Sequence, residues 1–241
     1  MNILIIVAHP DDEVLGMGGT IAKYASNGDN ISIVYLTTGI TSRRNPGYST
    51  KSSYEISVED QKLMDKEIKK LKVDALKSNK ILGITNSIFY DFPDNELDSI
   101  PLLKLVKVIE NEIKKFNPDI VYTNHFGDLN IDHRITYDAT LTACRPINNK
   151  IKKLISFEVP SSTEWNYPHS FNPNYFINIE KEIDSKIKSF KMFKSEIRNF
   201  PHPRSSLNLK IIAQRWGSVS GFKFAEAFEL IRQVDAWLLK T

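Results

Sequence analysis

Residues 3–13 read ILIIVAHPDDE, an apolar run that passes directly into a run of ionisable side chains. The first five are leucine and isoleucine or valine without interruption, the pattern of a central parallel strand buried on both faces. Residues 9–13 follow, and all of them except Pro10 have side chains that can ionise or bind a metal. Unpaired buried carboxylates are costly or shift their pKa. The stretch therefore predicts a metal site at the end of the first strand.

Strand and helix patterns alternate outward from this stretch. After the strand at 3–7 we expect a helix at 15–25, a strand at 31–37, a helix at 57–82, a strand at 87–90, a helix at 101–116, a strand at 119–123 and a helix at 135–144. Such alternation is typical of an α/β fold with an open, doubly wound, mostly parallel sheet and helices on both faces.

The last third of the chain is less regular. It predicts strands at 153–159, 174–179 and 225–232, helices at 181–193 and 207–215, and polar loops at 161–169 and 201–206. We expect a less regular C-terminal extension within a single domain spanning residues 1–241.

Composition excludes several classes of protein. The net charge is +3 with the charges interspersed, which argues against a nucleic-acid partner. Cys144 is the only cysteine, so neither an intrachain disulfide nor a cysteine-based zinc site is expected. The apolar run at 3–7 lacks a basic flank and is too short to span a membrane, so we expect a soluble, cytoplasmic protein without a transmembrane segment.

A second polar stretch, residues 124–134, follows the strand at 119–123. In open α/β sheets ligands bind beyond the carboxyl ends of the strands, where the winding order reverses. If the first and fourth strands are neighbours at that point, His9, Asp12 and His133 converge there.

These three residues suit a hydrolytic zinc site, which takes three histidine or carboxylate ligands and keeps a fourth position for water. Asp11 precedes Asp12 and can stand beside that water without binding the metal. The pKa of the water falls to roughly 7 in catalytic zinc sites, so a nearby carboxylate can take its proton. Asp11 is therefore the candidate general base.

Other polar residues have open roles. Asp132 either binds the metal, orients His133 or caps the following helix. His125 is a spare ligand or a residue lining the floor of the site, and His169 and His202 lie in loops of unknown placement.

The loop at 39–53 follows the second strand and carries Arg43 and Arg44. These arginines either hold an anionic or hydroxyl-rich ligand or stay solvated. The glycines at 16, 18 and 19 do not form the G-x-G-x-x-G spacing and follow carboxylates, which disfavours a dinucleotide site.

Residues 8–13 (AHPDDE) and 132–134 (DHR) resemble the two signatures of the PIG-L/LmbE-like zinc N-deacetylases. Weaker similarity extends along nearly the whole chain, at residues 92–95, 161–165, 202–205 and 225–228. The resemblance implies a Rossmann-like fold, one zinc ion per chain with another divalent metal as the alternative, and removal of acetyl from an N-acetylated amino sugar. It matches His9, Asp12 and His133 to the metal ligands and Asp11 to the general base.

One position departs from the family pattern. Members of the thiol-cofactor and glycosylphosphatidylinositol pathways commonly carry a histidine three positions before the last ligand, thought to stabilise the oxyanion, and here that position is Asn130. Asparagine can donate a hydrogen bond but cannot carry positive charge or pass a proton to the leaving amine. Either Asn130 keeps half of the role, or a remote histidine supplies the rest; we select His202, whose loop resembles one in the sugar-modifying branch.

The resemblance leaves the substrate open among nucleotide-linked, lipid-linked and free N-acetylated sugars and antibiotic intermediates. Arg44 and Asp94 are candidates for binding sugar hydroxyls or a phosphate, and Trp165 for stacking on a sugar ring. Related enzymes often assemble, so a homo-oligomer is a further expectation. Two other functions stay open: a metal-dependent phosphoesterase, which commonly uses two metals, and a sugar-binding protein that has lost catalysis, suggested by Asn130.

Overall fold

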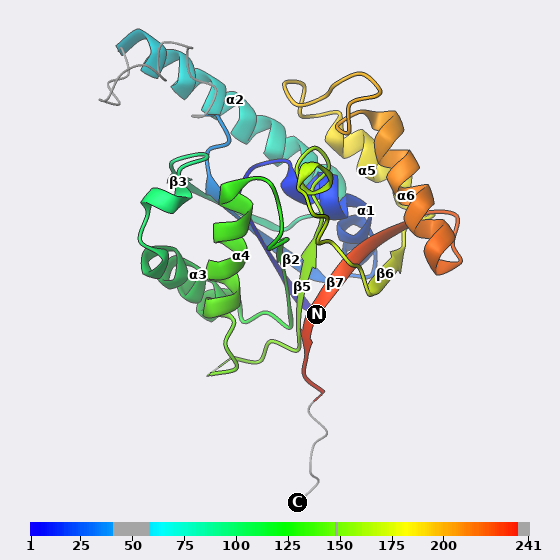
Figure 1. The fold of residues 1–241 in the computed structure, drawn as a ribbon. Coiled ribbons are helices and arrows are strands. Elements are labelled where there is room, and N and C mark those ends of the chain that lie inside the picture. Colours follow the sequence, from blue (N-terminus) through cyan, green and yellow to red (C-terminus); the bar gives the residue numbers. More distant parts are fainter. Residues whose placement is uncertain (41–57, 148, 236–241) are drawn as a thin grey trace, which may run out of the picture.

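The computed structural model describes residues 1–40, 58–147 and 149–235 (Figure 1). Each predicted helix and strand is present. In chain order they are β1 (Asn2–Val7), α1 (Asp12–Ser26), β2 (Asn30–Thr37), α2 (Val58–Leu82), β3 (Asn86–Phe92), α3 (Leu102–Phe116), β4 (Ile120–Asn124), α4 (Ile131–Ala143), β5 (Lys153–Phe157), β6 (Tyr175–Asn178), α5 (Ile183–Phe190), α6 (Ser206–Ser220) and β7 (Ala225–Gln233).

Two helices begin earlier than predicted. Helix α1 begins at Asp12 rather than at residue 15, because the acidic residues form its first turn. Carboxylates are favourable there, where the helix dipole is positive. Helix α4 begins at Ile131 rather than at residue 135, because Asn130 caps it: its side chain accepts a hydrogen bond from the backbone N–H of Asp132. Asp12 and His133 therefore both lie in the first turn of a helix.

The seven strands form one sheet in the order β3-β2-β1-β4-β5-β7-β6. Strands β3, β2, β1, β4 and β5 pair in parallel. Strand β7 is antiparallel to both β5 and β6. The predicted α/β fold with an open, mostly parallel sheet is thereby confirmed, and the last third of the chain adds three strands, β5, β7 and β6, to the same sheet.

The winding order reverses between β1 and β4. The chain moves outward from β1 to β2 and β3, then returns to place β4 on the other side of β1, with Ile6 opposite Thr123. The first and fourth strands are therefore neighbours, which is the condition on which the predicted convergence depended. The two polar stretches that follow these strands therefore begin side by side at one edge of the sheet.

Helices cover both faces of the sheet, as Figure 1 shows for α3 and α4 on one side and α1 and α5 on the other. Because side chains alternate along a strand, Ile3, Ile5 and Val7 pack in the core shared with α1, α2 and α5, whereas Leu4 and Ile6 pack under α3 and α4. None of the helices in the described ranges is long and apolar enough to cross a membrane.

Helix α1 is kinked at Met17, whose φ of −138° and ψ of 22° are not helical. The kink frees backbone amides within the helix, and the Glu226 carboxylate accepts hydrogen bonds from Gly19 N (3.0 Å) and Thr20 N (2.6 Å). Lys186 neutralises this buried carboxylate at 2.6 Å. Glu226 of β7 therefore caps the second half of α1.

Candidate metal centre

Backbone N–H groups in the turn between β1 and α1 donate hydrogen bonds to carboxylates of the first turn of α1. The backbone N–H of His9 donates to Asp12 Oδ2 (3.0 Å), and that of Asp11 donates to Glu13 Oε2 (3.1 Å). Asp11 has a φ of 124°, a conformation that residues other than glycine rarely adopt. Such strain persists where the surroundings enforce it, and it is common at functional sites.

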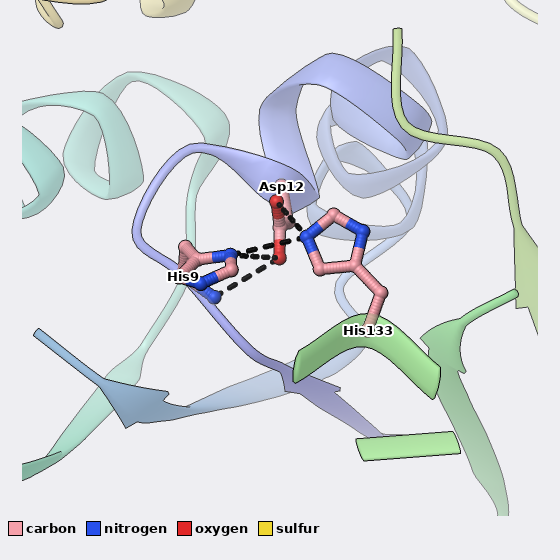
Figure 2. Close-up of side chains that lie close together, drawn as sticks. All are labelled: His9, Asp12 and His133. Atoms are coloured by element: carbon pink, nitrogen blue, oxygen red, sulfur yellow. Dashed lines mark hydrogen bonds and ion pairs between the residues drawn. The ribbon is translucent and has the colours of Figure 1, made fainter. Parts of the chain in front are cut away.

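His9, Asp12 and His133 converge from this turn and from the first turn of α4 (Figure 2). His9 Nδ1 lies 3.0 Å from His133 Nε2, and His133 Nε2 lies 3.3 Å from Asp12 Oδ1. One ligand atom from each residue falls within 4.8 Å of the others, and all three residues are buried. The structure thus brings together the three residues that the sequence predicts as ligands.

Two carboxylates hold the far nitrogen of His9. Its Nε2 lies 2.9 Å from Asp94 Oδ1 and 3.1 Å from Asp132 Oδ2. Asp132 is itself fixed by the backbone N–H groups of Asn95 (2.6 Å) and Leu97 (3.0 Å). Asp94 and Asp132 also form a second possible metal group with His9, but they contact the nitrogen that faces away from the first group. We interpret them as groups that orient His9.

Asp128 plays the same part for His133. Its Oδ2 lies 3.1 Å from His133 Nδ1. The hydroxyls of Ser162 and Thr163 donate to the Asp128 carboxylate, the latter at 2.7 Å. With the opposite nitrogens held by carboxylates, His9 Nδ1 and His133 Nε2 are the atoms left to bind a metal.

Asp12 offers the third donor. Its Oδ2 accepts hydrogen bonds from His9 N and from Asn124 Nδ2 (3.1 Å). Its Oδ1 is buried and has no hydrogen-bond partner within the described part of the chain. Two imidazole nitrogens and a carboxylate oxygen form a donor set that suits zinc, so the residues present fit a metal ion.

The three donors strongly perturb one another. Burial lowers the pKa of His133, but the carboxylates of Asp12 and Asp128 outweigh this effect and raise it to about 9. Burial also lowers the pKa of His9, but the surrounding carboxylates outweigh this effect and raise that pKa well above its usual value. Burial alone would raise the pKa of Asp12, but His133 and His9 hold it well below its usual range. A cation bound here would take the place of the protons on the two rings.

Asp11 lies beside the triad and is 3% exposed. Burial raises its pKa to about 7, although Arg204 opposes the shift. Arg204 Nη1 donates to Asp11 Oδ2 at 3.0 Å and to Glu196 Oε2 at 3.1 Å. A carboxyl group with a pKa near neutrality can both accept and return a proton.

A cavity of about 180 Å³ opens above these groups. The described residues that line it are His9, Pro10, Asp11, Gly39, Leu71, Asp94, Asn95, Asn130, Glu196 and Arg204. The candidate general base, one candidate ligand and several amide and carboxylate side chains therefore face one space.

Asn130 lines this cavity, but its side-chain amide already makes two hydrogen bonds within the protein. Its Oδ1 accepts a hydrogen bond from Asp132 N (2.8 Å), and its Nδ2 donates to Asn95 Oδ1 (3.0 Å). The capping role that the sequence left open for Asp132 thus belongs to Asn130, and Asp132 contacts His9 rather than His133.

The other predicted residues are placed less favourably. His202 does not line the cavity; its Nδ1 accepts a hydrogen bond from Arg204 N (3.0 Å), and its ring packs edge-on against Trp165. Burial, Arg204 and Arg198 lower the pKa of His202. Trp165 is 47% exposed, outside the cavity, and Arg44 lies outside the described residues.

Sequence reasoning assigned no role to Arg204, Glu196 or Asp128. Arg204 and Asp128 stand inside stretches that the sequence singled out, two residues after His202 and five before His133. Glu196 carries no local signal, because it lies among ordinary charged residues after α5.

Comparison with known proteins agrees with this geometry. The family model PIG-L, described as GlcNAc-PI de-N-acetylase, matches residues 4–144. The chain belongs to the PIG-L family. The matched part contains every predicted ligand and the candidate base, and the PIG-L family is one of metal-dependent deacetylases.

Two PIG-L relatives align over most of the chain. "Uncharacterized deacetylase YaiS" of Escherichia coli strain K12 is 31% identical over 200 residues, covering 80% of this chain and 91% of its own. The diacetylchitobiose deacetylase of Thermococcus kodakarensis is 27% identical over 246 residues, covering 95% and 83%. The crystal structure of the zinc inhibited form of teicoplanin deacetylase Orf2 has a TM-score of 0.74 at 15% identity, covers 98% of this chain and 100% of that one, and supports the fold.

Proposed function

We propose that this protein is a zinc-dependent hydrolase that removes the acetyl group from an N-acetylated amino sugar or sugar conjugate. The observation that carries the proposal is the convergence of His9 Nδ1, His133 Nε2 and Asp12 beside Asp11, at a cavity lined by polar side chains. Three histidine or carboxylate ligands with a neighbouring carboxylate are what metal-assisted amide hydrolysis requires.

His9, Asp12 and His133 would hold the metal ion, which would supply Lewis acidity toward an amide carbonyl and make water more acidic. Asp11 would take the proton from the attacking water and return it to the departing amine. Asn130 Nδ2 has two N–H groups and gives one to Asn95, so the other is assigned to the substrate oxygen. Asp94 and Asn95 line the cavity where sugar hydroxyls would lie.

The relatives support an amino-sugar substrate, since one of them is a diacetylchitobiose deacetylase. The proposal is tested by incubating the protein, loaded with one equivalent of zinc, with N,N′-diacetylchitobiose, N-acetylglucosamine and a nucleotide-linked N-acetylglucosamine, and measuring acetate. A parallel series with excess zinc is informative, because a structural neighbour exists in a zinc inhibited form.

Acetate release from one of these compounds is the expected result. Binding of the sugars by zinc-loaded and metal-free protein alike, without acetate, would instead indicate a sugar-binding protein. Two metal ions per chain together with phosphate-ester cleavage would indicate a phosphoesterase.

Asp11→Asn tests the general base. We expect the variant to bind zinc like the wild type, because Asp11 belongs to neither metal group of the described residues. Acetate release should fall about 1000-fold, within the range that a general base contributes. Asp184→Asn is the matched control, since that carboxylate is 90% exposed and does not line the cavity. Full activity in Asp11→Asn would show that the base is assigned wrongly.

A further inference from the structure

Arg204 brings three separate segments to one point beside the metal centre. Its Nε donates to Ser161 Oγ (2.6 Å) in the loop after β5. Its Nη1 donates both to Glu196 Oε2 (3.1 Å), after α5, and to Asp11 Oδ2 (3.0 Å), before α1. Asp11 and Arg204 are 193 positions apart in the chain.

Each anchor of this guanidinium is itself fixed. Ser161 has a φ of 76°, unusual for a residue with a side chain, and its N–H donates to the Glu164 carboxylate at 2.8 Å. Glu196 is 3% exposed and also accepts a hydrogen bond from Ser195 Oγ at 2.8 Å. The arginine fork is therefore held from two sides before it reaches Asp11.

Asp11 needs such support because its backbone is strained, with a φ of 124°. Within the described part of the chain, Arg204 makes no hydrogen bond or ion pair to His9, Asp12 or His133. Its direct contact at the centre is therefore with Asp11 and not with the metal ligands.

We propose that Arg204, held by Ser161 and Glu196, is the positioning residue for Asp11: it occupies Asp11 Oδ2 and turns Oδ1 toward the water. The inference rests on the proposed hydrolytic function. A lysine cannot replace it, because a single ammonium group lacks the planar fork that joins Ser161 to the two carboxylates.

The test compares Arg204→Met, Arg204→Lys and Arg204→Ala with Arg198→Met. Arg198 is a matched control from the same segment: it is exposed, and among the described residues its side chain donates hydrogen bonds only to the carbonyls of Ser195 and Ile197. Its backbone N–H donates to Arg204 O (3.1 Å), a bond that the substitution keeps. We expect the Arg204 variants to keep the wild-type zinc affinity and KM within about threefold. Their kcat should fall about 100-fold, the loss that misplacing a catalytic group by about 1 Å causes.

Added guanidinium should restore kcat at least tenfold in Arg204→Ala but not in Asp11→Asn, because only the former leaves a space of that shape. The crystal structure of zinc-loaded Arg204→Met should show the Asp11 carboxylate turned away from its wild-type position. The double variant Arg204→Met/Glu196→Gln removes one of the two buried carboxylate charges that Arg204 contacts, so it provides a folded protein if the single variant is unstable.

An unchanged kcat, a loss confined to KM, or zinc affinity falling in parallel with kcat would overturn the inference. An unmoved Asp11 in the variant structure would do so too. If the wild type deacetylates none of the sugars, the proposed function fails by itself, and the position of Asp11 in the variant then decides the inference alone.

Discussion

Two buried histidines follow β4, and they differ in one respect. His133 has a carboxylate at Nδ1, from Asp128, while its Nε2 points at His9 and Asp12. His125 also has a carboxylate at Nδ1, from Glu229 at 3.2 Å, but its Nε2 lies 3.1 Å from Ser170 Oγ. Both nitrogens of His125 therefore face ordinary protein partners.

The surroundings of His125 agree with a structural role. Its ring packs against Phe126 and Phe171, with centroids 4.4 and 5.2 Å away, and belongs to neither metal group of the described residues. A buried histidine beside a carboxylate is thus no sign of a metal site by itself. The sign is a second ring nitrogen that points at further ligand atoms.

The largest expected difference is between the variants His133→Gln and His125→Gln. We expect His133→Gln to lower zinc affinity more than about 100-fold, beyond the effect of losing an orienting group, and to abolish acetate release. His125→Gln should keep zinc and instead lower the free energy of unfolding by about 1–3 kcal/mol, because it removes a fully buried ring that packs against Phe126 and Phe171. Chelator competition and thermal unfolding measure the two effects, and zinc loss in His125→Gln would remove the distinction.

A smaller effect separates the two carboxylates. Asp128→Asn should weaken zinc binding about 10- to 100-fold, because Asp128 orients His133 and raises its basicity. Glu229→Gln should leave zinc affinity within twofold, since Glu229 faces His125. Equal losses in the two variants, by the same competition assay, would show that the effect comes from general destabilisation.

The smallest expected effect is the release of protons when zinc binds. In the metal-free protein the pKa of His133 is about 9, above its ordinary value of 6.5, so the ring is protonated at pH 7 and must lose that proton to bind zinc. Zinc affinity should therefore rise about tenfold per pH unit for each proton released, and the part of this rise that comes from His133 should end near pH 9. Calorimetry in two buffers should count at least one proton at pH 7 in the wild type and in His125→Gln. No proton release would contradict the raised pKa.

The sequence predicted the sheet and the central convergence because both follow from regular rules. Alternating apolar strands and helices place Ile3–Val7 in the middle of a parallel sheet, and the winding reversal then brings His9 and Asp12 to His133. Neither step depends on the path of a loop.

Loop paths were not predictable. Arg204, rather than His202, reaches the centre, where its Nε donates to the hydroxyl of Ser161. Ser161 has a positive φ, a conformation that no local sequence pattern predicts. Asp132 turned to His9 because Asn95 and Leu97, from the loop after β3, offer it backbone donors. These contacts join loops that are distant in sequence, where local spacing carries no information.

The cap that Glu226 places on α1 has a consequence for how the protein is made. Gly19 and Glu226 are 207 positions apart, whereas all three ligands of the proposed metal site lie within the first 133 residues. A ribosome therefore completes the whole ligand set long before it produces Glu226, the residue that caps the second half of α1. We expect the nascent chain to capture its metal only after β7 has emerged and paired with β5.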